Sequence, residues 1–264
     1  MTKSESHLFC NYLKPVSDLF ITLLLWGYFT LGFLILFSPI YLAAFLFSKN
    51  REIAFQRLNH HFYKGFFLLA RVFIPGHTLQ ISEEIRTIRS SVIVSNHVSY
   101  LDPLLMISLF EKHKTIVKST FFKVPIFGRM LKLSGYIPSA SGGKLSNLMI
   151  QRIEAMDDYL ASGGNLFIFP EGTRSRDGTI GRLNQGTFKI ARFCQPSIKV
   201  LFIHNTNKLF PPGKFLFNTY VSNAITVEQV ASIEPDYQSD TFSTAELMSQ
   251  VNGLLKAQNE RYNA

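Results

Sequence analysis

The chain has 264 residues, of which 47% are hydrophobic and only 17% are charged, and 25 are phenylalanine. This composition is too apolar for an ordinary soluble protein and not apolar enough for a multispan transporter, so we expect one folded domain with a membrane anchor. The net charge of +9 favours an anionic partner, either an acidic membrane surface, an anionic lipid or a nucleic acid. Cys10 and Cys194 are too few and too far apart for a disulfide framework or a cysteine metal site, which suits a reducing cytoplasm.

The first segment with a clear pattern is residues 19–48, which contain no charged side chain. The run exceeds the ~20 residues that a helix needs to cross a bilayer, and we assign residues 1–50 to an N-terminal helical membrane anchor. A cleaved signal peptide is disfavoured because the run is too long, starts too late and lacks a small-x-small cleavage pattern before Lys49. Pro39 leaves two forms open, one tilted helix or two shorter helices that enter and leave one leaflet.

The charge on either side of the apolar run predicts its orientation. The basic residues that follow the run are Lys49, Arg51, Arg57, Lys64 and Arg71. Only Lys3 and Lys14 precede it, and Glu5 and Asp18 offset them. Because positive charge collects on the cytoplasmic side, we expect the rest of the chain to lie there, at the inner membrane if the source is bacterial.

Residues 51–79 form the next expected segment, a linker helix. From Ile53 to Leu79 apolar and basic residues alternate in a way that is typical of an amphipathic helix. Such a helix lies on the membrane surface or packs on the following domain, and the sequence favours neither. The remaining residues, 80–264, are expected to form the main folded domain.

In that domain the pattern alternates between strand and helix. Apolar runs typical of strands occur at Ser91–Val94, Thr115–Val117, Leu166–Phe169 and Lys199–Ile203. Helical spacing occurs at Pro103–Phe110, Leu145–Leu160, Thr187–Phe193 and Ala245–Leu255. The alternation predicts an α/β fold with a mostly parallel sheet and flanking helices.

The first motif that could carry chemistry is Asn96-His97-x4-Asp102, between a strand and a helix. On a regular helix residues five apart point roughly 140° apart, so His97 and Asp102 can meet only if the chain turns between them. A carboxylate that holds one imidazole nitrogen leaves the other free to take a proton from an alcohol. The competing interpretation is that Asp102 caps the helix that begins at Pro103, which requires no catalysis.

The second motif is Phe169-Pro-Glu-Gly-Thr-Arg-Ser-Arg176, directly after an apolar strand. Pro170 and Gly172 favour a tight loop at the end of the strand. Polar groups point outward from this loop at Glu171, Thr173, Arg174 and Ser175. An arginine in such a loop can bind a phosphate through two parallel hydrogen bonds. A surface turn with an internal Glu–Arg ion pair is the weaker interpretation, because the loop follows a buried strand.

Together, the two motifs resemble those of the 1-acyl-glycerol-3-phosphate acyltransferase family over roughly residues 80 to 210. The resemblance implies that His97 is the catalytic base and Asp102 its partner. It further implies acceptor binding by Glu171 and Arg174, with Gly172, Thr173, Asn96 and Lys118 as further substrate-binding residues. Lys118 follows a predicted strand at the place where the family has a basic residue, with Pro125-Ile-Phe-Gly128 behind it.

Two blocks depart from the pattern of the family. The block G-x-I-x-x-R reads Gly135-Tyr-Ile-Pro-Ser-Ala140, so the expected arginine is missing at Ala140. This departure weakens lysophosphatidic acid as the acceptor and keeps another lysolipid, such as a lyso-aminolipid, as an alternative. The V-P block reads Val200-Leu-Phe-Ile-His204, which concerns the acyl pocket more than the chemistry.

The expected activity is therefore transfer of a fatty acyl group from acyl-CoA or acyl-carrier protein to the hydroxyl of a lysophospholipid, in phospholipid biosynthesis. No metal or cofactor is expected, because a thioester is already activated and needs only a base, orientation and oxyanion stabilisation. A non-catalytic membrane lipid-binding protein is the rival outside the enzyme class, and the four polar residues His97, Asp102, Glu171 and Arg174 argue against it. A nucleic-acid partner is disfavoured because the chain has no compact basic and aromatic cluster.

Overall fold

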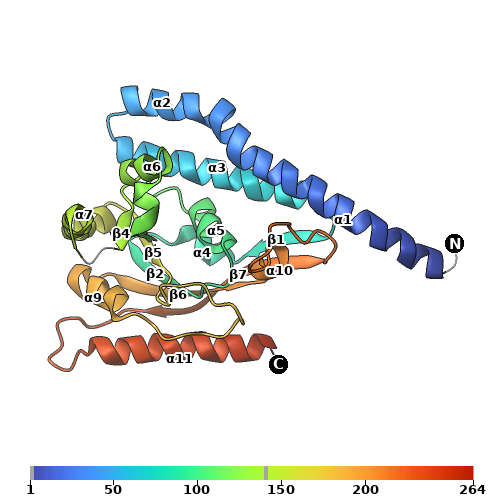
Figure 1. Cartoon of the computed structure of the whole chain (residues 1–264). Coiled ribbons are helices and arrows are strands. Elements are labelled where there is room, and N and C mark those ends of the chain that lie inside the picture. The colour runs from blue at the N-terminus through green and yellow to red at the C-terminus, as the bar shows by residue number, and fades with distance from the viewer. Residues whose placement is uncertain (1–2, 140–141, 264) are drawn as a thin grey trace.

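The computed structural model describes residues 3–139 and 142–263, with side chains from Lys14 onward. A twisted sheet forms the middle layer, with helices on both of its faces and a long N-terminal helical arm above them (Figure 1). The arm consists of α1 (Lys3–Gly27), a π-helical segment η1 (Tyr28–Phe37) and α2 (Ser38–Phe47), followed by α3 (Arg51–Phe73).

The arm is one continuous helix that bends, and α3 returns beside it to make a helical hairpin (Figure 1). The bend coincides with the π segment and with Pro39 in the first turn of α2, two usual causes of a helix kink. In the part of the chain that the structure describes, residues Lys14–Phe47 form the one helix that is long and apolar enough to cross a membrane. This helix supports association of the chain with a membrane.

Helix α3 packs on the folded domain through one of its faces. It begins at Asn50, whose side chain accepts a hydrogen bond from the Ile53 N–H. Its buried residues recur every three or four positions, which places them on one face, and that face packs against α5 (Leu101–Leu109). The buried residues are Phe55, Gln56, Asn59, His60, Phe62, Tyr63, Phe66, Phe67 and Ala70.

The sheet is mostly parallel, as predicted. Its strands are β1 (His77–Ile81), β2 (Ser91–Ser95), β3 (His113–Lys118), β4 (Ile137–Ser139), β5 (Asn165–Ile168), β6 (Ser197–His204) and β7 (Asn223–Ile233). The order is β1-β7-β6-β2-β5-β3-β4, and only the β6–β7 pair is antiparallel. The four predicted strands are the inner strands β2, β3, β5 and β6. The sequence missed β1, β4 and β7 because β4 is too short to give a pattern, whereas β1 and β7 are half-exposed.

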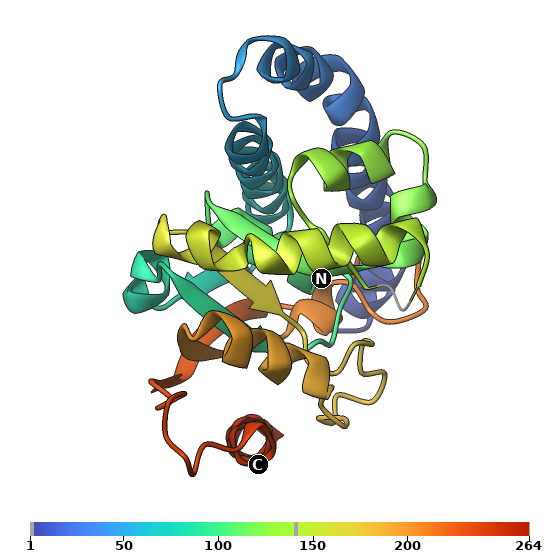
Figure 2. The same cartoon turned by 90° about the vertical axis from the view of Figure 1, so that its left-hand side faces the viewer.

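The helices after α3 are mostly short, and several were not predicted. They are α4 (Glu83–Thr87), α5, the 3₁₀ turn η2 (Ser119–Lys123), α6 (Phe127–Leu133), α7 (Lys144–Glu154), α8 (Met156–Ala161), α9 (Gln185–Cys194), α10 (Thr206–Leu209) and α11 (Thr244–Asn263). The helix expected at 145–160 is divided into α7 and α8 at Ala155. One hydrophobic core lies between the sheet and α3 and α5, and a second lies between the sheet and α9 and α11 (Figures 1 and 2).

The topology brings four loops together. Strands β6, β2, β5 and β3 are neighbours in that order and run parallel, so their carboxyl ends meet at one edge of the sheet. Ligands of open α/β sheets bind outside the carboxyl ends of the strands. Both sequence motifs follow strands of this group, which places them at the same edge.

Candidate active site

His97 and Asp102 meet in the loop between β2 and α5. The His97 Nδ1 lies 2.9 Å from the Asp102 Oδ2, so the chain turns as the spacing required. The Asp102 side chain is fully buried, whereas 15% of the His97 side chain is exposed. The His97 ring also stacks on Phe169, with the ring centroids 4.5 Å apart, which fixes its plane. Its Nε2 makes no hydrogen bond within the described residues and is the nitrogen open to a substrate.

The interpretation of Asp102 as a helix cap is wrong. Asp102 is the second residue of α5, and the residue before the helix, Tyr100, makes no side-chain cap. The Asp102 Oδ2 instead points back into the loop and accepts hydrogen bonds from the backbone N–H of Val98 and of Ser99, each at 2.7 Å. The carboxylate thus holds both the imidazole and the backbone that carries it.

Thr206, the first residue of α10, completes the surroundings of the carboxylate. Its hydroxyl is fully buried and donates to the Asp102 Oδ1, the oxygen that His97 does not use. Thr206 follows Asn205, which has a left-handed backbone with φ of 66° and donates from its side-chain amide to the Ala224 carbonyl. The sequence analysis missed Thr206, because its only signal is a hydroxyl residue just after the end of a predicted strand.

Asn96 is buried beneath this loop and does not face the open side of the site. Its amide nitrogen donates to the Ile203 carbonyl at 2.9 Å, and its amide oxygen accepts from the Ile203 N–H at 2.7 Å. These bonds extend the pairing of β2 with β6 by one residue beyond the strand. Asn96 therefore anchors the His97 loop to the strand that leads to Thr206, and only 1% of the residue is exposed.

Glu171 links the two motifs. Its Oε1 accepts from the His97 N–H at 3.1 Å, and its Oε2 accepts from the Gly181 N–H at 2.9 Å. Burial raises the pKa of the Glu171 carboxyl above its usual value, although these two backbone donors oppose the shift. A second bond joins the motifs, because the Ser175 N–H donates to the His97 carbonyl at 2.8 Å.

The loop after β5 presents the guanidinium of Arg174. Gly172 has φ of 68°, a conformation that favours glycine, and Thr173 is exposed beside it. The Arg174 guanidinium lies 4.0 Å over the ring of Tyr100. Its Nη1 is buried and has no hydrogen-bond partner within the described residues. A guanidinium with free donors can bind an anion through parallel hydrogen bonds.

The other expected substrate residues lie farther along the same edge or outside the description. Lys118 is the last residue of β3, the strand next to β5, and its side chain is exposed. Ala140, where the arginine of the family is missing, lies outside the described residues. The edge of the sheet thus carries a histidine held by a carboxylate after β2, an arginine after β5 and a lysine at the end of β3.

These features define the class of the protein, an α/β domain with a histidine–aspartate pair next to an arginine at the carboxyl edge of its parallel strands. Residues 77–203 match the protein-family model described as Acyltransferase. This match over residues 77–203 agrees with the resemblance seen in the two motifs.

Curated relatives agree with this assignment. The 1-acyl-sn-glycerol-3-phosphate acyltransferase LPAT1 of Arabidopsis thaliana chloroplasts is 30% identical over 163 residues, 60% of this chain and 45% of that protein. A 1-acyl-sn-glycerol-3-phosphate acyltransferase of Borreliella burgdorferi is 28% identical over 160 residues, 58% of this chain and 60% of that protein. The matched region spans less than two thirds of either relative.

A solved structure shows the same fold. The crystal structure of the 1-acyl-sn-glycerophosphate acyltransferase PlsC from Thermotoga maritima matches with a TM-score of 0.72, covering 95% of this chain and 98% of that one. The sequence identity is 20%, so this likeness speaks for the architecture.

Proposed function

We propose that the chain transfers a fatty acyl group from acyl-CoA or acyl-carrier protein to the free hydroxyl of 1-acyl-sn-glycerol-3-phosphate, giving phosphatidic acid. The observation that carries the proposal is the pairing of His97 and Asp102, 2.9 Å apart, beside the buried and unpartnered Nη1 of Arg174. A base for a hydroxyl and a site for a phosphate are the two groups that this acceptor requires. The names of the relatives support the same acceptor.

In the proposed reaction the acceptor oxygen attacks the thioester carbonyl carbon while the His97 Nε2 takes the hydroxyl proton. Asp102 holds the Nδ1–H of His97 and stabilises the imidazolium that forms. When the tetrahedral intermediate collapses, the C–S bond breaks and the thiolate leaves with the proton from His97. The products are the ester and the free thiol, and His97 returns to its neutral form.

The remaining residues bind or position. Arg174 pairs with the acceptor phosphate, which satisfies its buried Nη1, and Lys118 adds a less directional contact from the end of β3. Gly172 and Thr173 belong to the loop that shapes this phosphate site. Glu171 and Asn96 hold the backbone around His97, so we assign them positioning roles and no direct contact with the head group.

The alternative acceptor is a less acidic lysolipid, and the missing arginine at Ala140 is the feature that favours it. A purified-protein assay with a panel of lysolipids against both thioester donors tests the proposal. We expect the highest kcat/KM with lysophosphatidic acid. If arginine at this position sets specificity, Ala140→Arg raises the preference for lysophosphatidic acid over lysophosphatidylethanolamine.

Two outcomes of this assay contradict the proposal. A higher kcat/KM for a lyso-aminolipid than for lysophosphatidic acid would identify the lyso-aminolipid as the acceptor. An absence of turnover with every pair of substrates would favour a non-catalytic lipid-binding protein.

We further propose that the residues after Lys49 lie on the cytoplasmic side of the membrane. The basic residues that follow the apolar helix support this orientation. Labelling of single cysteines at exposed positions of α11 in intact and opened cells tests it. If a reagent that does not cross the membrane labels these cysteines in intact cells, the residues after Lys49 lie on the opposite side of the membrane.

A further inference from the structure

Residues 121–132, here called the elbow, expose apolar side chains next to the catalytic domain. The elbow joins η2 to α6, and four of its large apolar side chains are more than one third exposed. They are Phe121 at 45%, Val124 at 44%, Ile126 at 61% and Phe127 at 38%. Such a cluster on a short segment differs from the scattered apolar residues of an ordinary surface, and it indicates a contact surface.

The backbone of the elbow holds these four exposed apolar side chains, here called the apolar tip, away from the domain. Ile126 has φ of 62° and ψ of −62°, and the Phe127 N–H donates to the Pro125 carbonyl across it, which is a tight three-residue turn. Branched residues seldom adopt this conformation, and local strain of this kind marks functional segments. Gly128 keeps the turn against η2, because a Cβ there would lie 2.3 Å from the Phe122 carbonyl oxygen. The strained turn therefore exposes Ile126 and gains no burial for it within the domain.

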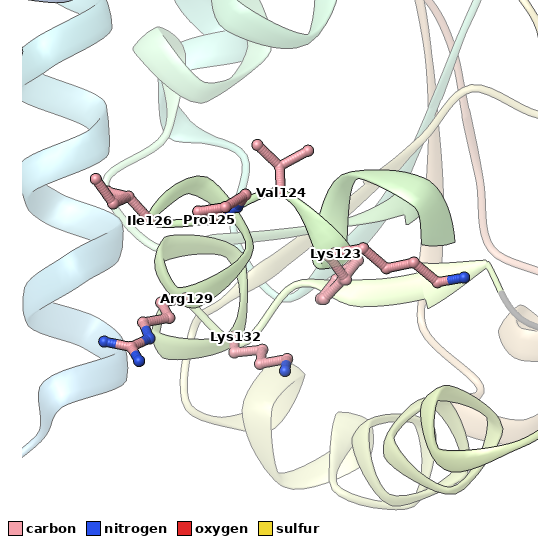
Figure 3. A pocket seen from close by; sticks show the side chains of 7 residues that line it. Lys123, Val124, Pro125, Ile126, Arg129 and Lys132 are labelled. Carbon is pink, nitrogen blue, oxygen red and sulfur yellow. The ribbon is translucent and has the colours of Figure 1, made fainter.

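Three cations surround the apolar tip. Lys123, Arg129 and Lys132 line, with the apolar residues between them, a pocket of about 450 Å³. None of the three forms an ion pair with a carboxylate in the described part of the chain. In Figure 3 the Arg129 guanidinium points toward a blue N-terminal helix, and Lys123 points the opposite way. The three cationic side chains therefore point in different directions around the turn.

We propose that the elbow is a second membrane contact, which inserts its apolar tip into the interface while its cations bind anionic phospholipid headgroups. Helix α6 packs on α3, which directly follows the apolar helix, so the elbow lies beside the hairpin (Figures 1 and 2). An apolar tip within a basic collar is typical of segments that lie at an anionic bilayer surface. A soluble phosphate ligand would use the cations and leave the four apolar side chains without a role.

The test uses the full chain reconstituted in vesicles and a single tryptophan as reporter. The chain has one tryptophan, Trp26, so Trp26→Phe with Phe127→Trp places the only indole on the elbow. Lipids brominated near the glycerol end of their acyl chains quench an indole that lies in the interface. We expect strong quenching in phosphatidylcholine vesicles that contain phosphatidylglycerol, and weak quenching in phosphatidylcholine alone. Trp26→Phe with Phe193→Trp is the control, because Phe193 is 58% exposed on α9, across the sheet from the hairpin.

A matched pair of triple variants tests the cations. The elbow triple is Lys123→Ser, Arg129→Ser and Lys132→Ser, and the control triple is Lys189→Ser, Arg192→Ser and Lys256→Ser on α9 and α11. Each basic residue near an anionic surface contributes about a fivefold factor to binding, so the elbow triple lowers the docking equilibrium by about a hundredfold. Quenching of the elbow reporter then nearly disappears, while the control triple, with the same loss of charge, retains it.

Several results would overturn the inference. One is an elbow reporter that stays unquenched in both kinds of vesicle, and another is equal quenching with and without phosphatidylglycerol. If the elbow triple raises the KM for acyl-CoA and leaves the quenching intact, the cations serve the phosphates of the donor. Because quenching needs no turnover, failure of this inference is distinct from failure of the proposed function.

Discussion

Two clusters of polar side chains differ in how completely their hydrogen bonds are satisfied. The first is the site at the carboxyl edge of the sheet, where the Arg174 Nη1 and the His97 Nε2 lack partners within the described residues. The second, here called the α3 cluster, joins α3 to the sheet through Gln56, Asn59, His113, Ser134, Tyr136 and Tyr159.

The α3 cluster leaves no side-chain polar atom of these residues without a partner. Asn59 accepts from the Tyr41 hydroxyl and donates to the Ser134 Oγ and the Tyr136 hydroxyl. The His113 ring lies between the Tyr136 hydroxyl and the Phe110 carbonyl, each at 2.6 Å. A closed network of this kind rigidifies what it joins, and here it joins the membrane helices to the domain.

The difference between the two clusters lies in which polar atoms have no hydrogen-bond partner among the described residues. A satisfied cluster fixes position, whereas a cluster with an orphan donor and a free base has room for a ligand. Variants in the α3 cluster should therefore lose stability, whereas variants in the site at the carboxyl edge of the sheet should lose turnover.

The largest effect is expected for His97→Ala, which removes the proposed base. We expect kcat to fall by ~100-fold or more, since general bases contribute 10²–10⁴-fold, while the melting temperature and membrane retention stay near those of the parent. Steady-state kinetics and thermal unfolding of the same preparation measure both. Retention of more than a tenth of the turnover would exclude His97 as the base.

The next largest falls in kcat are expected for Asp102, the partner of the proposed base, and for Thr206. Asp102→Asn keeps the size and an acceptor oxygen but loses the charge that stabilises the imidazolium, so kcat should fall by up to ~10⁴-fold. Thr206→Val removes one hydrogen bond to Asp102, and a fall of about tenfold in kcat is expected, corresponding to about 1.4 kcal/mol. Thr206→Ser should restore most of it. Unchanged kinetics in Asp102→Asn, or no rescue by serine, would reduce these residues to structural roles.

Arg174→Lys tests the orphan donor. The change keeps the charge but loses the planar fork, so the KM for the acceptor should rise about tenfold, or ~1.4 kcal/mol, while that of the donor stays nearly constant. Lys118→Ala should act in the same direction and more weakly. Equal rises in both KM values would indicate general damage to the loop, and a rise for the donor alone would place Arg174 at the thioester donor.

In the α3 cluster, Asn59→Ala should lower the stability of the folded protein without changing the ratio of the KM for the acceptor to the KM for the donor. It leaves the buried Tyr41, Ser134 and Tyr136 hydroxyls short of a partner, which costs about 2–3 kcal/mol. Thermal unfolding in detergent measures the loss. Asn50→Ala, which removes only the exposed cap of α3, is the control and should cost about 1 kcal/mol. A selective change in one KM would contradict a purely positional role.

The smallest effect concerns pH. Burial lowers the pKa of His113 to about 3, well below its ordinary value of 6.5, so the folded protein holds it neutral. Its contribution to stability is complete above pH ~6.5 and is lost as the pH falls through that value toward 3, by up to ~1.4 kcal/mol per pH unit. His113→Gln should therefore show a flatter loss of stability between pH 7 and pH 5 than the parent. Equal slopes would exclude His113 from the acid sensitivity.

Much of the candidate site could be located from the sequence because its residues lie in two short local motifs. His97 and Asp102 are separated by one loop, and Glu171 and Arg174 by another, so strand-to-loop patterning alone places both pairs after parallel strands. The four inner strands could also be predicted from the sequence, because continuous apolar runs are typical of strands that are buried on both faces.

The tertiary structure alone decided how these pieces act on one another. Thr206 reaches Asp102, Asn96 binds Ile203 and Glu171 holds the His97 backbone, and each contact spans 74 residues or more of sequence. No local pattern encodes such pairs, because they arise when neighbouring strands bring their carboxyl ends together. The sequence by itself determined the apolar helix, the α/β fold class and the reactive residue types, since these depend on composition and spacing. The roles of those residues depend on which polar atoms remain free after folding, which only the packed structure determines.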